Sequence, residues 1–351
     1  MKTTQLSKNK INVNKYPKTK KYVNLYFHAH QPYRLSNYSI FDIGTDKYYF
    51  WGPEGQTNSE ILDRVSNIGY LKANDLMLEL IKTSGLKVSY SLSGVLLEQF
   101  EEFEPWMVDK FQEMIDTSKV ELIGETYYHS LAFFYSKSEF ARHVNKHREI
   151  IWRLFRERPQ VFRNTELTYR NDVGEFVREM GFKGIYAEGW DPILGWRSPN
   201  YIYKGKHVEF TPEEKETARS QKQGRVLKDI KLLLKNYRRS DDIAFRFQLK
   251  RWEGYPVTAD KFAHWIDEED GELINLCMDY ETIGEHHRED SGIFEFYRHL
   301  PSELAKKGVE FVTASEALQV SKGGTNDEVD FPYIVSWADH ERDLSAWMGN
   351  K

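Results

Sequence analysis

Two carboxylates in the sequence stand where a parallel β-sheet places residues that do chemistry. Glu166 closes a short predicted strand that starts with Val161 and Phe162, and Asp279 closes the apolar run 273–278. A charged group at the carboxyl end of a buried strand is costly to desolvate unless it has a partner or a task. Each could simply pair with a nearby arginine. Two facing carboxylates are also what the cleavage of a glycosidic bond needs, because one attacks or acts as a base while the other protonates the leaving oxygen.

Two histidines follow the first predicted strand, in the segment His28-Ala29-His30-Gln31-Pro32. Residues i and i+2 of an extended chain point to the same side, so His28 and His30 can act together. They could bind a metal ion, or they could bind sugar hydroxyls beside a carboxylate. The pattern leaves both alternatives open, and a metal site would draw its further ligands from Glu125, His129 and His286.

Two glutamates accompany another predicted strand, at 120–124. Glu121 lies inside this strand and Glu125 at its exit, four residues apart, so alternation places both on one side. Either one could reach a cleft formed by strand ends. His286 lies in the polar loop that follows Asp279 and is a further candidate for such a cleft.

The elements that must position these residues alternate along the chain. Apolar runs predict strands, and amphipathic stretches between them predict helices, including one over 59–84 with a break near Gly69. This alternation indicates parallel βα units, and polar residues after successive strands favour a barrel over an open sheet. The predicted strands are 22–27, 86–92, 120–124, 161–166, 183–187, 232–236, 243–247, 273–278 and 309–312.

Two further segments differ from this pattern. Residues 1–21 are rich in Lys, Asn and Thr, which predicts a disordered basic tail. Residues 204–226 are strongly charged and predict an insertion, either a lid or a solvated loop.

Composition excludes several classes of protein. The net charge is −5 with acids and bases mixed along the sequence, which argues against a nucleic-acid-binding protein. The single cysteine, Cys277, excludes an internal disulfide and a cysteine-rich zinc site, and it fits a cytoplasmic protein. We find no apolar run of the roughly 20 residues that a membrane span needs, and no secretory signal. Aromatic residues make up 15% of the chain, which suits either a large core or a groove with stacking platforms for sugar rings.

Several motifs in order give a more specific indication. The segments 28–32, 162–167 and 278–286 resemble the signature motifs of glycoside hydrolase family 57, and 335–350 resembles the last motif of its α-amylase-like members. This resemblance implies a distorted (β/α)7 barrel and a retaining enzyme that acts on α-glucans, α-1,4-linked as for an amylase, without a metal or other cofactor.

The resemblance also implies roles for individual residues. Glu166 would be the nucleophile, Asp279 the general acid/base, and His30 a substrate ligand near the nucleophile. Glu121 matches the glutamate of the family's second motif, with Ser118 in the place of its glycine. The residues implied to line the subsites are Trp190, Trp337 and Asp339.

The resemblance further implies how the chain is divided. Residues 22–322 would form the barrel, and 323–351 would begin a C-terminal helical region that is cut short in this sequence. We expect an α-glucan or maltooligosaccharide as the binding partner, and the sequence leaves hydrolysis, transfer to a sugar and the oligomeric state open. Two alternative functions remain: a carbohydrate-binding protein with little or no turnover, and a metal-dependent hydrolase or deacetylase that uses His28 and His30.

Overall fold

The computed structural model describes residues 20–45, 47–52, 55–321 and 327–348. Most of the predicted tail, 1–19, therefore lies outside the described residues, as do 322–326 and 349–351. Lys20 is exposed, whereas Lys21 is buried, and its amine donates to the main-chain oxygens of Ile266 and Asp267 at 3.3 and 2.7 Å. Lys21, which the prediction placed in the tail, is thus packed against the fold directly before the first strand.

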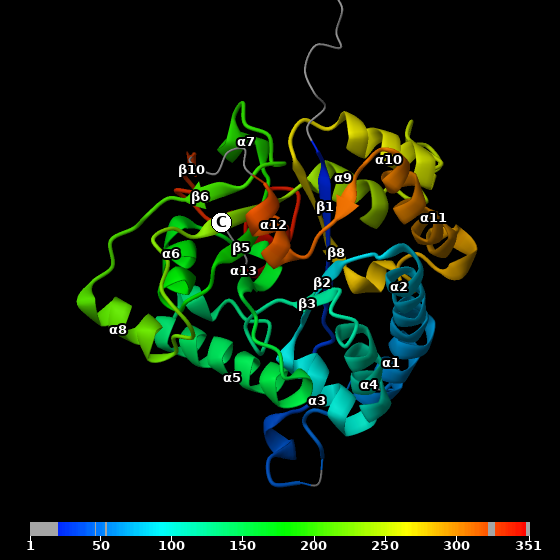
Figure 1. The fold of residues 1–351 in the computed structure, drawn as a ribbon. Helices are drawn as coiled ribbons and strands as arrows, with labels where there is room; N and C mark the ends of the chain where they lie inside the picture. Colours follow the sequence, from blue (N-terminus) through cyan, green and yellow to red (C-terminus); the bar gives the residue numbers. More distant parts are fainter. Residues whose placement is uncertain (1–19, 46, 53–54, 322–326, 349–351) are drawn as a thin grey trace, which may run out of the picture.

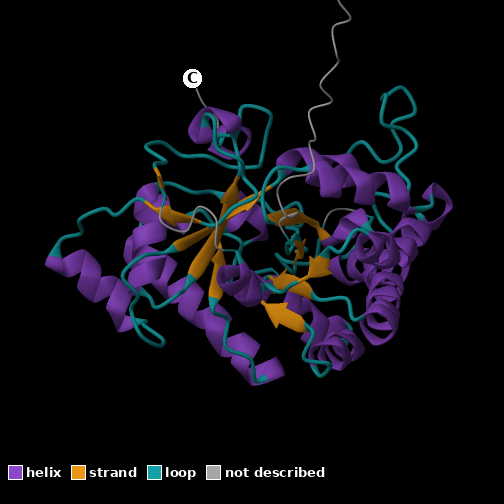
Figure 2. Cartoon of the chain, turned by 45° about the horizontal axis from the view of Figure 1, so that its top comes forward, coloured by secondary structure: helices purple, strands orange, loops and turns teal. Residues whose placement is uncertain are grey.

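Parallel strands arranged around a common axis form the centre of the fold (Figures 1 and 2). In the described part of the chain the ladder runs through β3, β2, β1, β8, β7, β5 and β4, each parallel to its neighbour. Their bounds are β1 Tyr22–Ala29, β2 Val88–Leu92, β3 Val120–Leu122, β4 Val161–Arg163, β5 Gly184–Glu188, β7 Lys231–Lys235 and β8 Leu273–Asp279.

Two contacts in this ring of strands are weak. β3 and β4 meet only through an isolated bridge between Gly124 and Phe162, and β7 and β8 share the single pair Lys235 and Asn275. The prediction of a distorted (β/α)7 barrel is confirmed. The distortion lies at these two contacts, where the barrel is incompletely closed.

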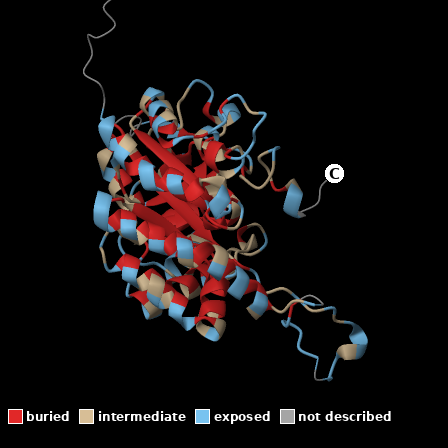
Figure 3. Ribbon diagram, turned by 90° about the vertical axis from the view of Figure 1, so that its right-hand side faces the viewer, coloured by how far each residue is buried: buried red, intermediate tan, exposed pale blue. Residues whose placement is uncertain are grey.

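Helices surround the barrel because each carries one apolar face that packs on the strands. Figure 3 shows buried residues concentrated on the strands and on the inner faces of the helices. None of the helices among the described residues is long and apolar enough to cross a membrane. The helices that follow the strands are α1 Asn58–Val65, α2 Leu71–Ser84, α3 Gly94–Phe103, α4 Pro105–Ile115, α5 Lys137–Phe155, α6 Asn171–Glu179, α9 Tyr237–Ala244, α10 Ala259–Glu268 and α11 Ile293–Lys306.

The barrel interior combines apolar packing with a buried polar network. Tyr26 and Tyr186 stack with ring centroids 4.4 Å apart, and the side chain of Asn24 accepts a hydrogen bond from the hydroxyl of Tyr186. After β9 (Glu310–Phe311), helix α12 (Ala314–Val320) packs against this interior, and the main-chain N–H of Ala314 donates to Ser89 at 3.0 Å. One end of the barrel is thereby filled by protein, which leaves the carboxyl ends of the strands for a site.

The charged segment 204–226 contains a strand and a helix. Strand β6 (Tyr203–Gly205) pairs antiparallel with β7 and parallel with β10 (Glu328–Val329). Helix α8 (Pro212–Ser220) packs on α5 and α6, as Figure 1 shows at its left edge. Two short helices complete the described chain, α7 (Asp191–Leu194) and α13 (Ser345–Met348).

Two local predictions need correction. The run 243–247 is wrong as a strand, because α9 covers its start; Asn236 caps this helix by accepting from Arg239 N–H at 3.0 Å. The helix α3 was not predicted, although Ser93 caps it in the ordinary way by accepting from Leu96 N–H. Near Gly69, where a break was predicted, the helix continues instead through a π-helical turn, Ser66–Tyr70, which joins α1 to α2.

This π-helical turn generates a stability prediction. A Cβ added to Gly284 would lie 2.4 Å from the carbonyl oxygen of Ile68, and Gly284 has a φ of +101°. We expect Gly284→Ala to cost about 1–2 kcal/mol for the backbone conformation and about 1–3 kcal/mol more for the clash. Urea unfolding measures this, and Gly292→Ala, with a φ of +84° and open space around it, controls for the backbone term. Equal losses in the two variants would contradict the close packing at Ile68.

Candidate active site

Polar and charged side chains meet at the carboxyl ends of the strands. In parallel barrels this is the end at which loops build sites. Each strand of the ring contributes near its end, and the contributing residues are His28 and His30 from β1, Ser91 and Ser93 from β2, Glu125 after β3, Arg163 and Glu166 at β4, Glu188 at β5, Lys235 at β7 and Asp279 at β8.

Glu166 is held by contacts to both of its carboxylate oxygens. Oε1 lies 2.7 Å from Nε2 of His129, and Oε2 accepts from the indole N–H of Trp337 at 2.9 Å. Its backbone has a φ of +57°, in the left-handed region that non-glycine residues rarely adopt. The carbonyl of Glu166 accepts from Ser336 Oγ and Trp337 N–H, so this conformation is stabilised by the C-terminal segment.

Glu166 and Asp279 have pKa values shifted in opposite directions. Burial alone raises the pKa of Glu166, but the hydrogen bond from His129 and the charge of Arg163 outweigh burial and lower it below the usual range. The protein around the carboxyl group of Asp279 excludes water, which raises its pKa, and the negative charge of Glu166 raises it further. Asp279 nevertheless has exposed surface, so it is open to solvent from the barrel mouth. Such a pair can present one ionised and one protonated carboxyl group to the same ligand.

His28 near the end of β1 and His30 directly after β1 stand beside this pair as neutral rings. The Nδ1 atoms of His28 and His30 lie 2.8 Å from the hydroxyls of Ser91 and Ser93. His30 stacks on His129 with centroids 4.2 Å apart, and His28 does so at 5.0 Å. Burial lowers the pKa of both His28 and His30, and the neighbouring charges of His129 and Arg163 lower it further.

Glu281 is a third carboxyl group near the site. It accepts hydrogen bonds from Tyr70 OH, from the main-chain N–H of His30 and from the side chain of Gln31. Burial raises its pKa to about 8, and the charge of Asp279 contributes to the shift. Glu281 therefore ties the His-Gln-Pro turn to the segment after Asp279.

A buried ion-pair network holds the C-terminal segment against the barrel. Arg342 donates to Glu188 at 2.7 Å and lies 3.4 Å from Asp241, while Lys235 lies 3.6 and 3.4 Å from the same two carboxylates. The ring of Trp337 lies 5.0 Å from the Lys235 amine. The network thus fixes the segment that supplies the indole N–H to Glu166.

The structure brings some predicted site residues together and leaves others apart. His28, His30, Glu125, Glu166, Asp279 and Trp337 lie in one cluster, and exposed His286 is near enough to lower the pKa of Asp279. Glu121 instead accepts from Ser315 at the start of α12, at 2.7 and 2.6 Å. Asp339 accepts from Ser345 and the main chain of its own segment, and Trp190 packs edge-on against Tyr333.

Three groups of the cluster were missed as site residues. From the sequence, His129 was named only as a possible metal ligand, and Arg163 was included only as part of the motif 162–167. A signal was present, because His129 follows the predicted strand 120–124 and Arg163 lies in the same predicted strand as Glu166, three residues before it. Glu281 alternates with Asp279, which could have pointed to it as well.

Three residues of the described chain could offer ligands to a metal ion. Ligand atoms of His28, Glu125 and His129 lie within 4.8 Å of one another. The guanidinium of Arg163 lies 3.9 Å from Glu125 Oε2 and 3.3 Å from His129 Nδ1, so a cation is already present among these donors. A second, divalent cation would be repelled there, and the donor set does not fit a metal site.

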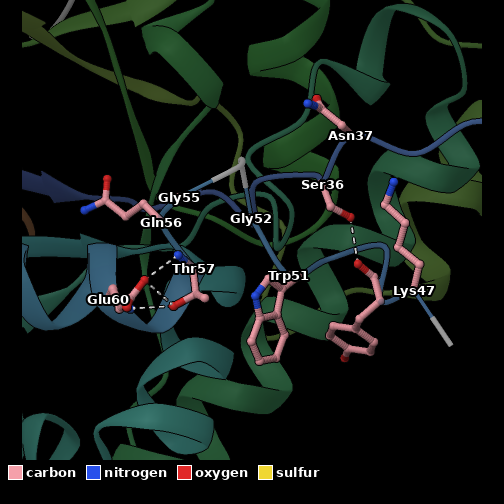
Figure 4. Close-up of a pocket in the computed structure, with 10 residues that line it drawn as sticks. Ser36, Asn37, Lys47, Trp51, Gly52, Gly55, Gln56, Thr57 and Glu60 are labelled. Carbon is pink, nitrogen blue, oxygen red and sulfur yellow. Dashed lines mark hydrogen bonds between the residues drawn. The ribbon is translucent and has the colours of Figure 1, made fainter.

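A large cavity of about 850 Å³ lies in the loop between β1 and α1, not at the carboxylate pair (Figure 4). Trp51, Tyr48 and Lys47 are among its lining residues. Of the described residues that line it, Glu60 alone is a carboxylate, and Glu60 is bonded to Thr57. The cavity therefore lacks the opposed groups that the barrel mouth has.

Comparisons with known proteins agree with this arrangement. The family model for glycosyl hydrolase family 57 matches residues 24–334. A protein from Methanocaldococcus jannaschii named "Putative alpha-amylase" is 42% identical over 329 residues, which are 93% of this chain and 65% of that protein. The chain thus spans about two thirds of the length of this curated relative.

Solved structures share the fold at low identity. A 4-alpha-glucanotransferase from Thermococcus litoralis superposes with a TM-score of 0.65 at 17% identity, over 91% of this chain and 43% of that chain. A GH57-type branching enzyme from Pyrococcus horikoshii superposes with a TM-score of 0.63 at 14% identity, over 93% and 74% of the two chains.

The contact between Trp337 and Glu166 generates a prediction. A hydrogen bond donated to the ionised form lowers the pKa of a carboxyl group, so Trp337→Phe should raise the pKa of Glu166. NMR titration of the labelled glutamate carboxyl carbons measures this pKa. Trp152→Phe, on the outer helix α5, serves as the control and should leave it unchanged. A Glu166 pKa equal in wild type and Trp337→Phe would show that the indole does not hold the carboxylate.

Proposed function

The chain belongs to glycosyl hydrolase family 57, and from that premise we propose that it cleaves α-glucans by a retaining mechanism. Glu166 is the nucleophile and Asp279 the general acid/base. The products arise by hydrolysis or by transfer to another glucan, since the same covalent intermediate serves both. The substrate class is α-1,4-linked glucan or maltooligosaccharide.

One observation supports this proposal above the others, namely the opposite pKa shifts of Glu166 and Asp279. A nucleophile must be ionised, and a general acid must carry its proton at the working pH. Glu166 has the lowered pKa and Asp279 the raised one. The environments therefore favour these two roles and disfavour the reverse assignment.

The proposed reaction has two steps. Asp279 gives its proton to the glycosidic oxygen while a carboxylate oxygen of Glu166 attacks the anomeric carbon; the bond to the leaving sugar breaks and a glycosyl ester forms. In the second step Asp279, now ionised, takes a proton from water or from a sugar hydroxyl. The oxygen so activated attacks the anomeric carbon and releases Glu166 as a carboxylate.

Other side chains at the barrel mouth bind the substrate in this proposal. His30 stands beside the nucleophile as a neutral ring, and Trp337 offers a half-buried aromatic face. Trp190 and His286 serve subsites farther out. Glu121 and Asp339 act indirectly, through the start of α12 and the C-terminal segment respectively. The proposal needs neither nucleic acid nor a membrane, and it includes a cytoplasmic location, with Cys277 as a buried free thiol.

Two variants test the assignment of roles. Glu166→Gln should lower kcat on maltooligosaccharides about 10³-fold or more, because the amide is not a nucleophile. Asp279→Asn should lower it about 10²–10⁴-fold, the usual contribution of general acid–base catalysis. Reducing-sugar release and product chromatography measure both. Full activity in either variant would overturn the assignment.

The pH profile gives a further prediction. The active form has Glu166 ionised and Asp279 protonated, so kcat/KM should fall as pH drops through the lowered pKa of Glu166 and as pH rises through the raised pKa of Asp279. A substrate with a good leaving group, such as an α-glycosyl fluoride, needs no protonation. With this substrate Asp279→Asn should keep the acid limb and lose the alkaline limb. An alkaline limb that persists in Asp279→Asn would assign the proton donor to another group.

A further inference from the structure

Glu125 is an unusual carboxylate because it is fully buried and yet lacks ordinary partners. In the part of the chain that the structure describes, neither of its oxygens has a hydrogen-bond partner. Other buried glutamates are bonded, for example Glu188 to Arg342 at 2.7 Å and Glu175 to the guanidinium of Arg178 at 2.5 Å. A carboxylate buried in this way is costly unless nearby positive charge or a function compensates it.

Three nitrogen atoms surround Glu125 at ion-pair distance. Oε1 lies 3.7 Å from Nδ1 of His28, and Oε2 lies 3.9 Å from both Nδ1 of His129 and Nη1 of Arg163. His28 is held neutral by burial, which lowers its pKa. Arg163 and His129 are therefore the two neighbours of Glu125 that can carry a positive charge.

His129 links Glu125 to the proposed nucleophile. Its Nε2 faces Glu166 at 2.7 Å, while its Nδ1 faces Glu125 on one side and Arg163 at 3.3 Å on the other. Arg163 favours a lone pair on Nδ1, and Glu125 favours a proton there. The pKa of His129 reflects this, since burial lowers it but the nearby carboxyl groups of Glu125 and Glu166 outweigh burial and raise it.

The backbone and the neighbouring rings restrict where His129 can turn. Its φ is +51°, and its main-chain N–H donates to Thr126 at 3.1 Å. The imidazole also stacks on the rings of His28 and His30. Rotation of the ring is thus limited, and Glu125 acts on an imidazole already aimed at Glu166.

We propose that Glu125 is a positioning residue for Glu166, and that it acts through His129 by stabilising the imidazolium whose Nε2–H is directed at the nucleophile. The inference rests on the proposed function of Glu166. Glu166 loses its negative charge when it forms the glycosyl ester and regains it when the ester is cleaved. Glu125 takes no part in these bond changes, so His129 keeps the same carboxyl neighbour and its orientation during both steps.

Two other roles for Glu125 fit the structure less well. A substrate ligand needs exposed surface, and Glu125 has none. A metal ligand would have to share the site with the guanidinium of Arg163, 3.9 Å away. The sequence-based expectation that Glu125 binds substrate directly is therefore replaced by an indirect role behind His129.

The protonation of His129 depends on every charged or titratable group that faces it. Some act directly and others through Glu125, whose main-chain N–H donates to His147. These groups are His28 and His30 from β1, Glu125 after β3, His147 from α5, Arg163 from β4, Glu166 after β4 and Asp279 from β8.

NMR of the His129 ring nitrogens tests the inference without any need for turnover. Glu125→Gln keeps the shape of the side chain and removes its charge, so the pKa of His129 should fall by about one unit, a tenfold loss of proton affinity. Glu175→Gln changes a buried glutamate whose ion-pair partners are Arg178 and His207, and it should leave this pKa unchanged. An unchanged His129 pKa in Glu125→Gln would overturn the proposal. If Glu125→Gln does not fold, Glu125→Asp replaces it, with a smaller fall expected and no change again overturning the proposal.

Kinetics supply a second readout that a merely structural role would not produce. Glu125→Gln should lower kcat on maltooligosaccharides about tenfold with KM little changed, and His129→Gln should have a similar effect. If Glu125 acts through His129, the double variant should be no worse than His129→Gln alone. Additive losses would contradict the linkage. Thermal unfolding of each variant separates these effects from loss of the fold.

The two readouts also separate this inference from the proposed function. If Glu166→Gln retains full activity, the proposed function fails, and the NMR comparison still decides whether Glu125 controls His129. If Glu166→Gln is inactive while the His129 pKa is the same in wild type and Glu125→Gln, the role of Glu125 fails alone.

Discussion

The ionised carboxylate of Glu166, held half-buried at the end of β4, is the constraint on which the rest of the site depends. A carboxylate in that position is stable only if donors and positive charge surround it. Three different parts of the chain meet this need: His129 after β3, Arg163 from β4 itself and Trp337 from the C-terminal segment. The barrel is what brings these distant segments to one point.

The C-terminal segment is an integral part of the site rather than an appendage to the barrel. Val335 pairs with Tyr169, directly after the turn that carries Glu166, and Trp337 reaches both the carbonyl and the carboxylate of Glu166. Arg342 secures the segment through Glu188. The left-handed backbone at Glu166 is thereby compensated by hydrogen bonds from residues about 170 positions later in the chain.

Predictions of strands and helices from the sequence succeeded where the local hydrophobic pattern agreed with the tertiary environment of the segment. The βα alternation predicted the barrel. The motifs grouped Glu166, Asp279, His28, His30 and Trp337, and the structure brings these residues into one cluster. The prediction failed at 243–247, where an apolar run resembled a strand but Asn236 caps a helix that covers its start. Glu121 was expected near the cleft but contacts the start of α12 instead. Alternation places its side chain inside the barrel without indicating that α12 fills that end.

The sequence alone therefore determined the class of fold and the family, because both follow from local periodicity and from short ordered motifs. The tertiary structure decided which carboxyl group is favoured as ionised, since the pKa of each depends on burial and on charges from other strands. It also decided the place of Glu125, of His129 and of Arg163. Their relation to Glu166 arises only when the segments after β3 and at β4 meet and the barrel brings His28 and His30 against His129. Local pattern does not encode this long-range geometry.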